Sequence, residues 1–432
     1  MMSPNRHPGG QPASLPSMLA AKTLGWLCSG TSLLVLTCTV VTACHRTGSE
    51  PTAMQRDSAG IQIIDNASPV WTAPAWQVDS TPGLDLGGRG AAEPFQFEQL
   101  VDGAIEANGN IIAADRGRAQ VLVYDEDGSF RMAIGRKGDG PGEFRGLIAV
   151  AATGDSIIAF DWRSARLSIF NAGTGQLLDA VQLKAPGDNR HPIYTYKMAG
   201  LADSTVVLAP WSFMPHHSGG NRVYWDSTAA LLYGLNGRLI RRGAPYMGAE
   251  MYDGPRGATL RPFGAFFSVA VAKGYIYVGD GRNYDICVYR ATGQLERIIR
   301  RHWTPRPVTD QDRSAEVEGY VRRAGFPSVD DPRATQLRRM LENAPFPRNM
   351  PAFLGLIVDD SGDVWVRRYE PIGTRIPAKW DVFDNRGYWL GTVQLPRNLH
   401  IYQIAGHRIL GTWQDSLNVQ HFGYYAIKRD TG

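Results

Sequence analysis

Residues 108–128 read NGNIIAADRGRAQVLVYDEDG, and this stretch decides the fold. A tight turn at Gly109 opens a short apolar strand that ends at Asp115, and the next strand ends nine residues later at Tyr124. A second turn closes at Gly128. The same spacing from an aspartate to an aromatic residue recurs as Asp161 with Phe170 and as Asp280 with Tyr289. The chain therefore contains a repeat built from short strands.

Turns of this kind mark six units along the chain. The opening turns centre on Gly109, Gly154, Asp203, Gly274, Gly362 and Gly406, and closing turns end at Gly128, Gly175, Gly237, Gly293 and Gly387. A repeat of about 45 residues, made of short apolar strands and tight turns, is typical of a propeller with four-stranded blades. The sequence therefore predicts an all-β fold, a six-bladed β-propeller.

The N-terminal 43 residues predict a targeting segment rather than a part of the fold. Arg6 and Lys22 supply positive charge before an apolar stretch at 24–41, which runs into Val41-Thr42-Ala43-Cys44. These four residues resemble a bacterial lipobox, in which a small residue precedes a cysteine that is acylated and becomes the new N-terminus. We expect residues 1–43 to be a lipoprotein-type signal peptide, Cys44 to carry lipid, and residues 44–58 to form a polar tether.

Two other interpretations of this segment stay open. An apolar stretch of about 18 residues nearly spans a bilayer, so it is also a candidate transmembrane anchor. Ordinary secretory cleavage after Ala43 is the other alternative. His45 is not the aspartate associated with retention in the inner membrane, so the favoured location is the bacterial cell envelope, lipid-anchored at the outer membrane.

Cysteine usage agrees with this assignment. Cys28 and Cys38 leave with the signal peptide and Cys44 is blocked by lipid, so Cys287 has no partner for an intramolecular disulfide. Cys287 lies in an expected strand, where a buried, small apolar role is the usual one.

The folded domain is expected to span residues 59–432. A short apolar strand at 61–64 stands outside the repeats, and the last unit, from about Ile401, is too short for four strands. We expect the N-terminal strand to complete the last blade and close the ring, which would leave no free sheet edge.

Residues 305–351 interrupt the repeat with helical signals. Thr309 and Asp312 have capping-box spacing, and Val317, Tyr320, Val321 and Ala324 recur at helical intervals before Gly325. A second helix is expected to begin at Asp331 and Pro332. The prediction is a small helical insertion between blades four and five.

The first repeat, from Asn108 to Gly128, resembles an NHL-type repeat. Residues 59–432 are similar to the six-bladed, NHL-like propeller lipoproteins of bacterial envelopes. The features that match are Gly138–Phe144 after the first blade, the helical insertion, and Val358-Asp359 with Gly362–Val366 beyond it. Since members of that group mostly lack an assigned activity, the resemblance implies a fold rather than a chemistry. Asp115, Asp161 and Asp280 are expected to be structural turn residues that bind backbone amides.

The long insertions predict which face of the propeller carries the function. Residues 210–228 and 368–379 connect second to third strands, whereas 244–263 and 305–351 run between blades. In a propeller both kinds of connection emerge on the same face. Because elaborated loops on a rigid scaffold usually carry function, we expect binding on this insertion-bearing face.

Candidate ligand-binding residues on this face are basic and aromatic. Arg116, Arg118, Arg163 and Arg282 occupy similar positions in their blades, where they would attract an anionic ligand or an acidic peptide. The alternative is that each arginine pairs with neighbouring acids. Trp211, Phe213, Tyr246 and Tyr252 are candidates for an aromatic patch, with the packing of long loops as the alternative.

Signals for a metal or a cofactor are weak, and none is predicted. His216 and His217 are adjacent and, with His191 and His302, lack a chelating spacing. Pro141 interrupts the glycine run at 135–142, and no helix pattern follows it to bind phosphate. No Gly-x-Ser-x-Gly elbow is present.

The favoured function is a non-catalytic, lipid-anchored module that binds a protein, peptide or glycan. A net charge of +4 over 432 residues gives no support for nucleic-acid binding. The alternative is a metal-dependent hydrolase resembling propeller lactonases, with a divalent metal in the central channel. That chemistry needs converging carboxylates, for which Glu98 and Asp102 are candidates. A purely structural role in an envelope assembly is the third possibility.

Overall fold

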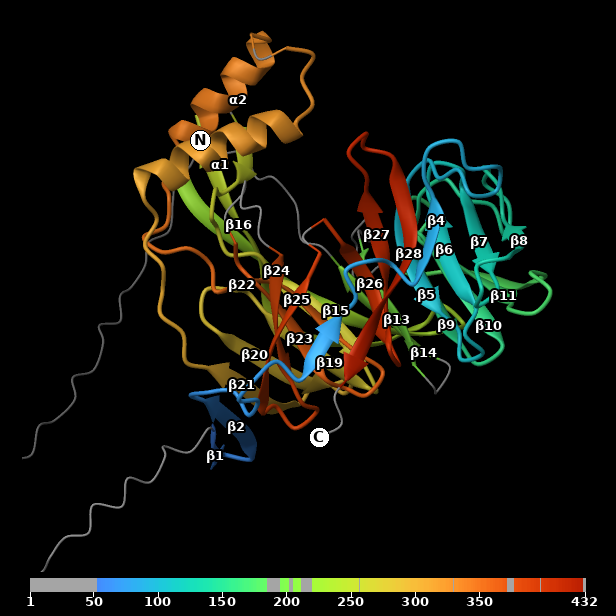
Figure 1. Cartoon of the computed structure of the whole chain (residues 1–432), viewed down its shortest axis with the longest axis horizontal. Coiled ribbons are helices and arrows are strands. Elements are labelled where there is room, and N and C mark those ends of the chain that lie inside the picture. The colour runs from blue at the N-terminus through green and yellow to red at the C-terminus, as the bar shows by residue number, and fades with distance from the viewer. Residues whose placement is uncertain are drawn as a thin grey trace, which may run out of the picture. The chain divides into compact units, whose positions relative to one another are not determined.

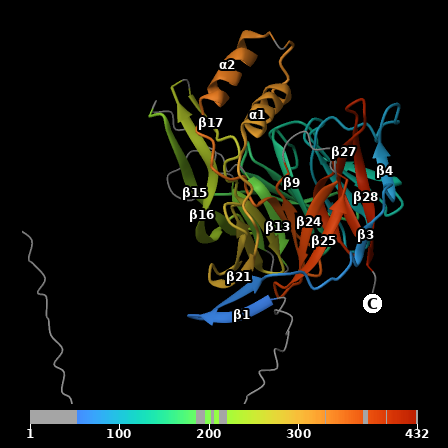
Figure 2. The same cartoon turned by 60° about the vertical axis from the view of Figure 1, so that its left-hand side comes forward.

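The computed structural model describes residues 53–184, 195–201, 205–210, 220–255, 257–328, 330–370, 377–396 and 398–429. Within these residues the strands form six sheets that surround a central axis (Figure 1 and Figure 2). The six-bladed β-propeller that the repeats predict is confirmed.

The first three blades follow the chain in order. Blade one contains β5 (Leu100–Ile105), β6 (Ile111–Asp115), β7 (Gln120–Tyr124) and β8 (Phe130–Ile134). Blade two contains β9 (Leu147–Thr153), β10 (Ser156–Asp161), β11 (Arg166–Asn171) and β12 (Leu177–Gln182). Blade three contains β13 (Thr195–Leu201), β14 (Thr205–Pro210), β15 (Arg222–Gly234), β16 (Leu239–Gly254) and β17 (Gly257–Leu260).

The last three blades include strands from the N-terminal segment. Blade four contains β18 (Ser268–Ala272), β19 (Tyr275–Gly279), β20 (Asp285–Arg290) and β21 (Leu295–Arg301), extended by β2 (Ile61–Asn66) and β1 (Ala53–Ser58). Blade five contains β22 (Phe353–Val358), β23 (Val364–Arg368), β24 (Ala378–Phe383) and β25 (Trp389–Leu395). Blade six contains β26 (His400–Ala405), β27 (Arg408–Gln414) and β28 (Gln420–Arg429), with β3 (Trp76–Val78) and β4 (Leu84–Gly87) on β28.

Burial of both faces of each sheet explains the apolar strands. Ile111 and Ile112 point to opposite faces of blade one, and both are fully buried. Phe144 and Phe170 fill the space between blades one and two, with their ring centroids 6.3 Å apart. The turn before β6 uses glycine because Gly109 has φ +94°, a conformation that costs other residues energy.

The predicted partner of the N-terminal strand was wrong. β2 lies parallel to β21 at the outer edge of blade four, instead of completing blade six. Asn66 fixes it there, since its Nδ2 donates to the carbonyls of Arg300 (2.8 Å) and Gly387 (3.0 Å). The N-terminal segment does complete blade six, but through β3 and β4, which pair with β28.

The strands of blade three extend into segments that the sequence analysis expected to be loops. Its β15 and β16 pair well beyond the blade, and β17 pairs with the end of β16, so part of the expected loops at 210–228 and 244–263 is regular sheet. Figure 2 shows this extension at the same end of the propeller as the helices. The candidates Trp211, Phe213, His216, His217 and His191 lie outside the described residues.

The helical insertion lies between β21 and β22, as predicted. Its helices are α1 (Asp310–Arg323) and α2 (Pro332–Glu342). The capping box of α1 is present, because Asp312 N donates to Thr309 Oγ1 and Thr309 N donates to the Asp312 carboxylate. Figure 1 places the helices at one end of the propeller and β1 and β2 at the other. Among the described residues, neither helix is long and apolar enough to cross a membrane.

Candidate functional site

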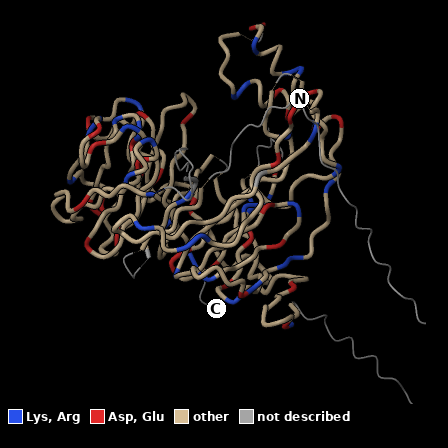
Figure 3. Tube along the Cα trace, turned by 180° about the vertical axis from the view of Figure 1, so that it is seen from behind, with Lys and Arg blue, Asp and Glu red and all other residues tan. Residues whose placement is uncertain are grey.

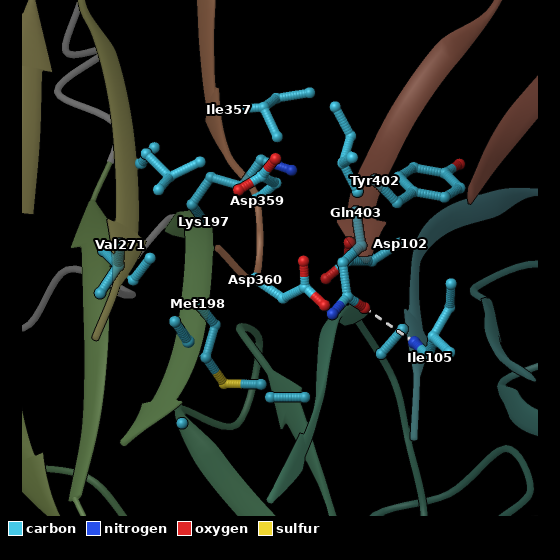
Figure 4. A pocket seen from close by; sticks show the side chains of 18 of the residues that line it. Asp102, Ile105, Lys197, Met198, Val271, Ile357, Asp359, Asp360, Tyr402 and Gln403 are labelled. Carbon is cyan, nitrogen blue, oxygen red and sulfur yellow. Dashed lines mark hydrogen bonds between the residues drawn. The ribbon is translucent and has the colours of Figure 1, made fainter. Parts of the chain in front are cut away.

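A cavity of about 390 Å³ occupies the centre of the propeller. All six inner strands line it: β5, β9, β13, β18, β22 and β26. Figure 4 shows Asp102, Lys197, Asp360 and Gln403 around it, from different strands and strand ends. Small side chains such as Ala151 and Gly200 keep the middle open. The wall of the cavity therefore combines apolar strand residues with a few charged side chains of both signs.

Several of these polar groups form hydrogen bonds that connect neighbouring blades. Asp102 is 9% exposed, and its Oδ2 accepts a hydrogen bond from Val150 N at 3.1 Å, which joins blades one and two. Burial raises the pKa of Asp102, while the charge of Lys197 opposes that shift. Gln403 accepts from Ile105 N at 2.7 Å and so joins blades six and one.

The carboxylates considered for hydrolysis do not converge. Asp102 lines the central cavity, whereas Glu98 is outside its lining and precedes β5. In the part of the chain that the structure describes, no three His, Cys, Asp or Glu side chains are grouped closely enough to hold a metal ion. His302 is exposed at the end of blade four.

The four predicted arginines do not line the central cavity but contact groups nearby. Arg116 Nε donates to Gln99 Oε1 at 3.1 Å, and Arg118 forms an ion pair with Glu93. Arg163 stacks 5.1 Å from the centre of the Trp162 ring. Arg282 Nε donates to Asp280 Oδ2 at 2.8 Å. Arg118 and Arg282 thus pair with neighbouring acids, as in the alternative interpretation, and a role of the four arginines in ligand binding stays a prediction.

The three repeat aspartates accept hydrogen bonds from turn amides. Asp115 accepts from the N–H groups of Glu98, Gln99 and Arg118, and Asp161 from those of Arg145, Gly146, Arg163 and Ser164. Asp280 accepts from Arg282 N at 3.0 Å. In blades one and two the carboxylate thus ties the turn after the second strand to the segment that enters the blade.

The two described aromatic candidates are interior residues, which corrects the expected surface patch. Tyr246 is 7% exposed and packs against Phe267, with ring centroids 5.9 Å apart. Tyr252 is 1% exposed, and its hydroxyl donates to Asn221. They stabilise the extension of blade three instead of presenting a surface to a partner.

A second cavity, of about 240 Å³, lies on the insertion-bearing face between blades four and five. Arg301 at the end of β21, Arg306 beyond it and Arg368 at the end of β23 contribute to its lining. Trp303, Met350 and Tyr369 supply apolar surface. We call this the arginine cavity.

A single buried carboxylate holds two of these arginines. Asp381, on β24, has no exposed surface and accepts from Arg368 Nε (2.8 Å) and Nη2 (2.7 Å). Arg301 Nη1 lies 3.3 Å from Asp381 Oδ2, and the hydroxyls of Tyr284 and Thr392 also donate to this carboxylate, at 2.5 and 2.8 Å. Burial lowers the pKa of the Arg368 guanidinium. The hydrogen bonds and the negative charge of Asp381 raise this pKa by more, so it lies above its usual value. Contacts with Asp381 therefore fix both guanidinium groups in place.

The remaining contacts also fix the cations. Arg301 lies between two aromatic rings, 5.0 Å from the centre of Tyr284 and 4.0 Å from that of Trp389. Arg306 is more exposed and pairs with Asp312 at the start of α1, at 2.9 Å. The helical insertion thus contributes to one wall of the cavity.

The sequence did not identify this site. Tyr284, Arg301, Arg368 and Asp381 come from four different strands or turns of two blades. None of them occurs in a motif, and blade packing alone brings them together. The available signal was the predicted insertion, which lies beside them in the fold.

Comparisons with known proteins agree on the fold. A family described as a 6-bladed beta-propeller (DUF5128) matches residues 101–190, a segment that includes blades one and two. No curated protein matches the chain.

Three solved structures illustrate the similarity. A protein of Bacteroides fragilis described as exported has 12% identity and a TM-score of 0.45, with 85% of this chain and 99% of that chain covered. A member of the DUF4221 family from Bacteroides vulgatus has 10% identity and a TM-score of 0.48, with 82% and 99% covered. A gluconolactonase of Xanthomonas campestris has 12% identity and a TM-score of 0.38, with 77% and 88% covered. The family match and the six sheets identify this chain as similar to six-bladed β-propellers.

Proposed function

We propose that this protein is a binding module of the bacterial cell envelope. Its insertion-bearing face would bind a protein, peptide or glycan partner without catalysis. The observation that carries this proposal is the one-sided elaboration of the propeller: the extension of blade three and α1 with α2 project from the same face (Figure 2). A rigid scaffold with elaborated loops on one face is a common arrangement for recognition.

The charge distribution supports recognition through a local site. Figure 3 shows basic and acidic residues interspersed along the whole trace, without one extended tract of either sign. Against this background, the arginine cavity combines three guanidinium groups with aromatic surface. Arginine and aromatic residues are enriched where partners bind most tightly.

The proposal includes a location. Lipid on Cys44 would tether the propeller to the outer membrane, with the signal peptide at 1–43 removed. The expected tether at 44–58 is shortened to residues before Ala53, because residues 53–58 form β1 and pair with β2. A tether of this kind would leave the insertion-bearing face free to meet a partner in the envelope.

Site-specific photocrosslinking in cells tests the proposed face. A photoreactive amino acid at Trp225 or Leu417, which are 46% and 59% exposed on the insertion-bearing face, should yield a common crosslinked species. Leu178 and Ile240, which are 56% and 52% exposed beside the tight turns of the opposite face, are matched controls. Crosslinks at the control positions alone, or at none of the four, would contradict the proposed binding face.

A further inference from the structure

We propose that the arginine cavity binds the C-terminal carboxylate of a peptide partner. This inference rests on the proposed function, because it names the chemistry by which the insertion-bearing face would recognise its partner. The cavity would hold the carboxylate against its arginines and the last side chain against its apolar wall.

The charge of the cavity wall favours an anion. Three arginines line the cavity, and no acidic side chain belongs to its lining among the described residues. Asp381 is fully buried behind the wall and is shared by Arg301 and Arg368. Glu370 acts on Arg368 from outside the lining. A ligand in the cavity therefore meets cations first.

Donor atoms remain for such a ligand. Arg368 uses Nε and Nη2 for Asp381, and Arg301 uses Nη1. Within the described residues, Arg368 Nη1 and Arg301 Nη2 have no recorded acceptor. The Nε of Arg301 is buried without an acceptor, so the protein satisfies this cation incompletely. Since both guanidinium groups are already held in place, binding would cost little side-chain ordering.

The size and the remaining wall favour one terminal residue. The cavity measures about 240 Å³, below the range of about 300–1,000 Å³ that holds drug-sized ligands. Trp303, Met350 and Pro351 supply apolar surface next to the arginines. A chain end presents a carboxylate and an apolar side chain on one residue, and it requires only one exit for the backbone. A phosphate group carries about −1.5 to −2 charge and offers no apolar group for this wall.

Calorimetric titration of the full chain in detergent tests the proposal with three defined peptides. The first is acetyl-Gly-Ser-Gly-Ser-Phe with a free C-terminal carboxylate, and the second is its C-terminal amide. The third, acetyl-Gly-Ser-Gly-Glu-Phe amide, carries its carboxylate on a side chain. We expect the free acid to bind at least about tenfold more tightly than either amide. Equal binding of the free acid and an amide, or no binding of the acid at about 1 mM, would overturn the proposal.

A variant that leaves the buried cluster intact locates the binding. Arg306 is 53% exposed in its side chain, so Arg306→Gln should fold normally and weaken binding of the free acid by about three- to tenfold. Arg145→Gln is the matched control: Arg145 is 56% exposed in its side chain and pairs with Asp139 at 2.9 Å, so the change removes the same charge at the entry to blade two and should leave the affinity unchanged. Equal losses in the two variants would indicate a general charge effect and would overturn the assignment to this cavity.

The two proposals fail in different ways. Crosslinks from Trp225 and Leu417 that coincide with equal binding of acid and amide would retain the binding face and reject the carboxylate site. Preferential binding of the free acid without crosslinks on that face would support the cavity as a carboxylate site and reject the proposed partner-binding face.

Discussion

Asp381 is the residue on which the junction of blades four and five most depends. Its carboxylate accepts from Arg368, Tyr284 and Thr392 and lies 3.3 Å from Arg301, while it is itself fully buried. Burial and the nearby Asp381 charge both raise the pKa of Tyr284, so this tyrosine stays a neutral donor. A buried carboxylate with so many donors is compensated by the positive charges of the two arginines beside it.

Asp381→Asn should destabilise the protein strongly, because it leaves two partly buried guanidinium groups without their anion. Removing one partner of a buried ion pair typically costs about 3–5 kcal/mol. Denaturant unfolding followed by tryptophan fluorescence measures this loss. Asp139→Asn is the control: it breaks the exposed pair with Arg145, at 2.9 Å, which should contribute about 0–1 kcal/mol. A similar small effect of both changes would show that Asp381 is not a stabilising centre.

At the residue scale the sequence predicted local contacts better than distant ones. Asp115 and Asp161 were expected to bind turn amides, and a carboxylate placed just before a turn finds such donors within a few residues. Tyr246 and Tyr252 were candidates for a surface because their segment looked like a loop. Pairing of β15 with β16 turns that segment into sheet and buries both rings, and no local pattern encodes this pairing.

At the scale of elements, α1 carries an acidic side chain on its buried face. Glu316 is 6% exposed, and its Oε2 has no hydrogen-bond partner. Burial raises the pKa of Glu316 to about 7, with Arg323 opposing the shift. Burial raises the pKa values of the nearby Tyr320 and Tyr369, and the charge of Glu316 adds to this shift. The carboxyl group is therefore protonated in the folded protein under mildly acidic conditions.

The docking of α1 should weaken as pH rises from about 4.5 to 7. In this window the folded state holds a proton on Glu316 that the unfolded state, with a pKa near 4.5, has released. The stabilisation is complete below pH 4.5 and absent above 7, a difference of roughly 3 kcal/mol. Hydrogen exchange of α1 across this range measures it when it is expressed as protection factors, which correct for the intrinsic pH dependence of exchange, and Glu316→Gln should make these protection factors insensitive to pH. A wild-type profile that is flat from pH 4.5 to 7 would contradict this account.

The closing strand β4 depends on a glycine in β28. A Cβ at Gly423 would lie 2.0 Å from the carbonyl oxygen of Leu84, too close for β4 to keep its pairing. We expect Gly423→Ala to destabilise the protein by about 1–3 kcal/mol and to speed hydrogen exchange in β4. Gly355→Ala in β22 is a matched control, because its nearest neighbour, Arg367 Cβ, is 4.0 Å away. If β4 exchanges as slowly in the Gly423 variant as in the wild type, the strand can shift and keep its pairing with β28.

Element types were easier to predict than element partners. The capping box at Thr309 and the spacing of apolar residues identified α1, because these signals are local. The apolar strand at β2 was recognised, but its partner was not, since an exposed edge of any blade can accept such a strand. Asn66 fixes β2 on blade four through hydrogen bonds to residues of blades four and five that lie more than 200 residues away in sequence.

At the scale of the whole molecule, the N-terminal segment binds three blades before the first repeat begins. β2 pairs with blade four, Val70 and Trp71 donate to carbonyls of β25 in blade five, and β3 with β4 completes blade six. The repeat predicted the number of blades because each blade repeats the same local pattern. The arrangement of this segment is not periodic, and only the finished ring shows it.

This arrangement gives the proposed tether a defined point of attachment. The chain enters the propeller at β1 and β2, and Figure 1 shows these strands at the end opposite α1 and α2.

Cys44→Ala should abolish lipid attachment, because it removes the thiol that lipidation of a lipobox cysteine requires. The variant should appear as a soluble protein or as an uncleaved precursor, measured by membrane fractionation together with labelling by a palmitate analogue. Cys38→Ala removes a cysteine within the same apolar stretch and should leave labelling unchanged. Persistent labelling of the Cys44 variant would place the lipid elsewhere. A variant that stays in the membrane without label would instead point to a transmembrane anchor at 24–41, and the tether would then begin inside the bilayer.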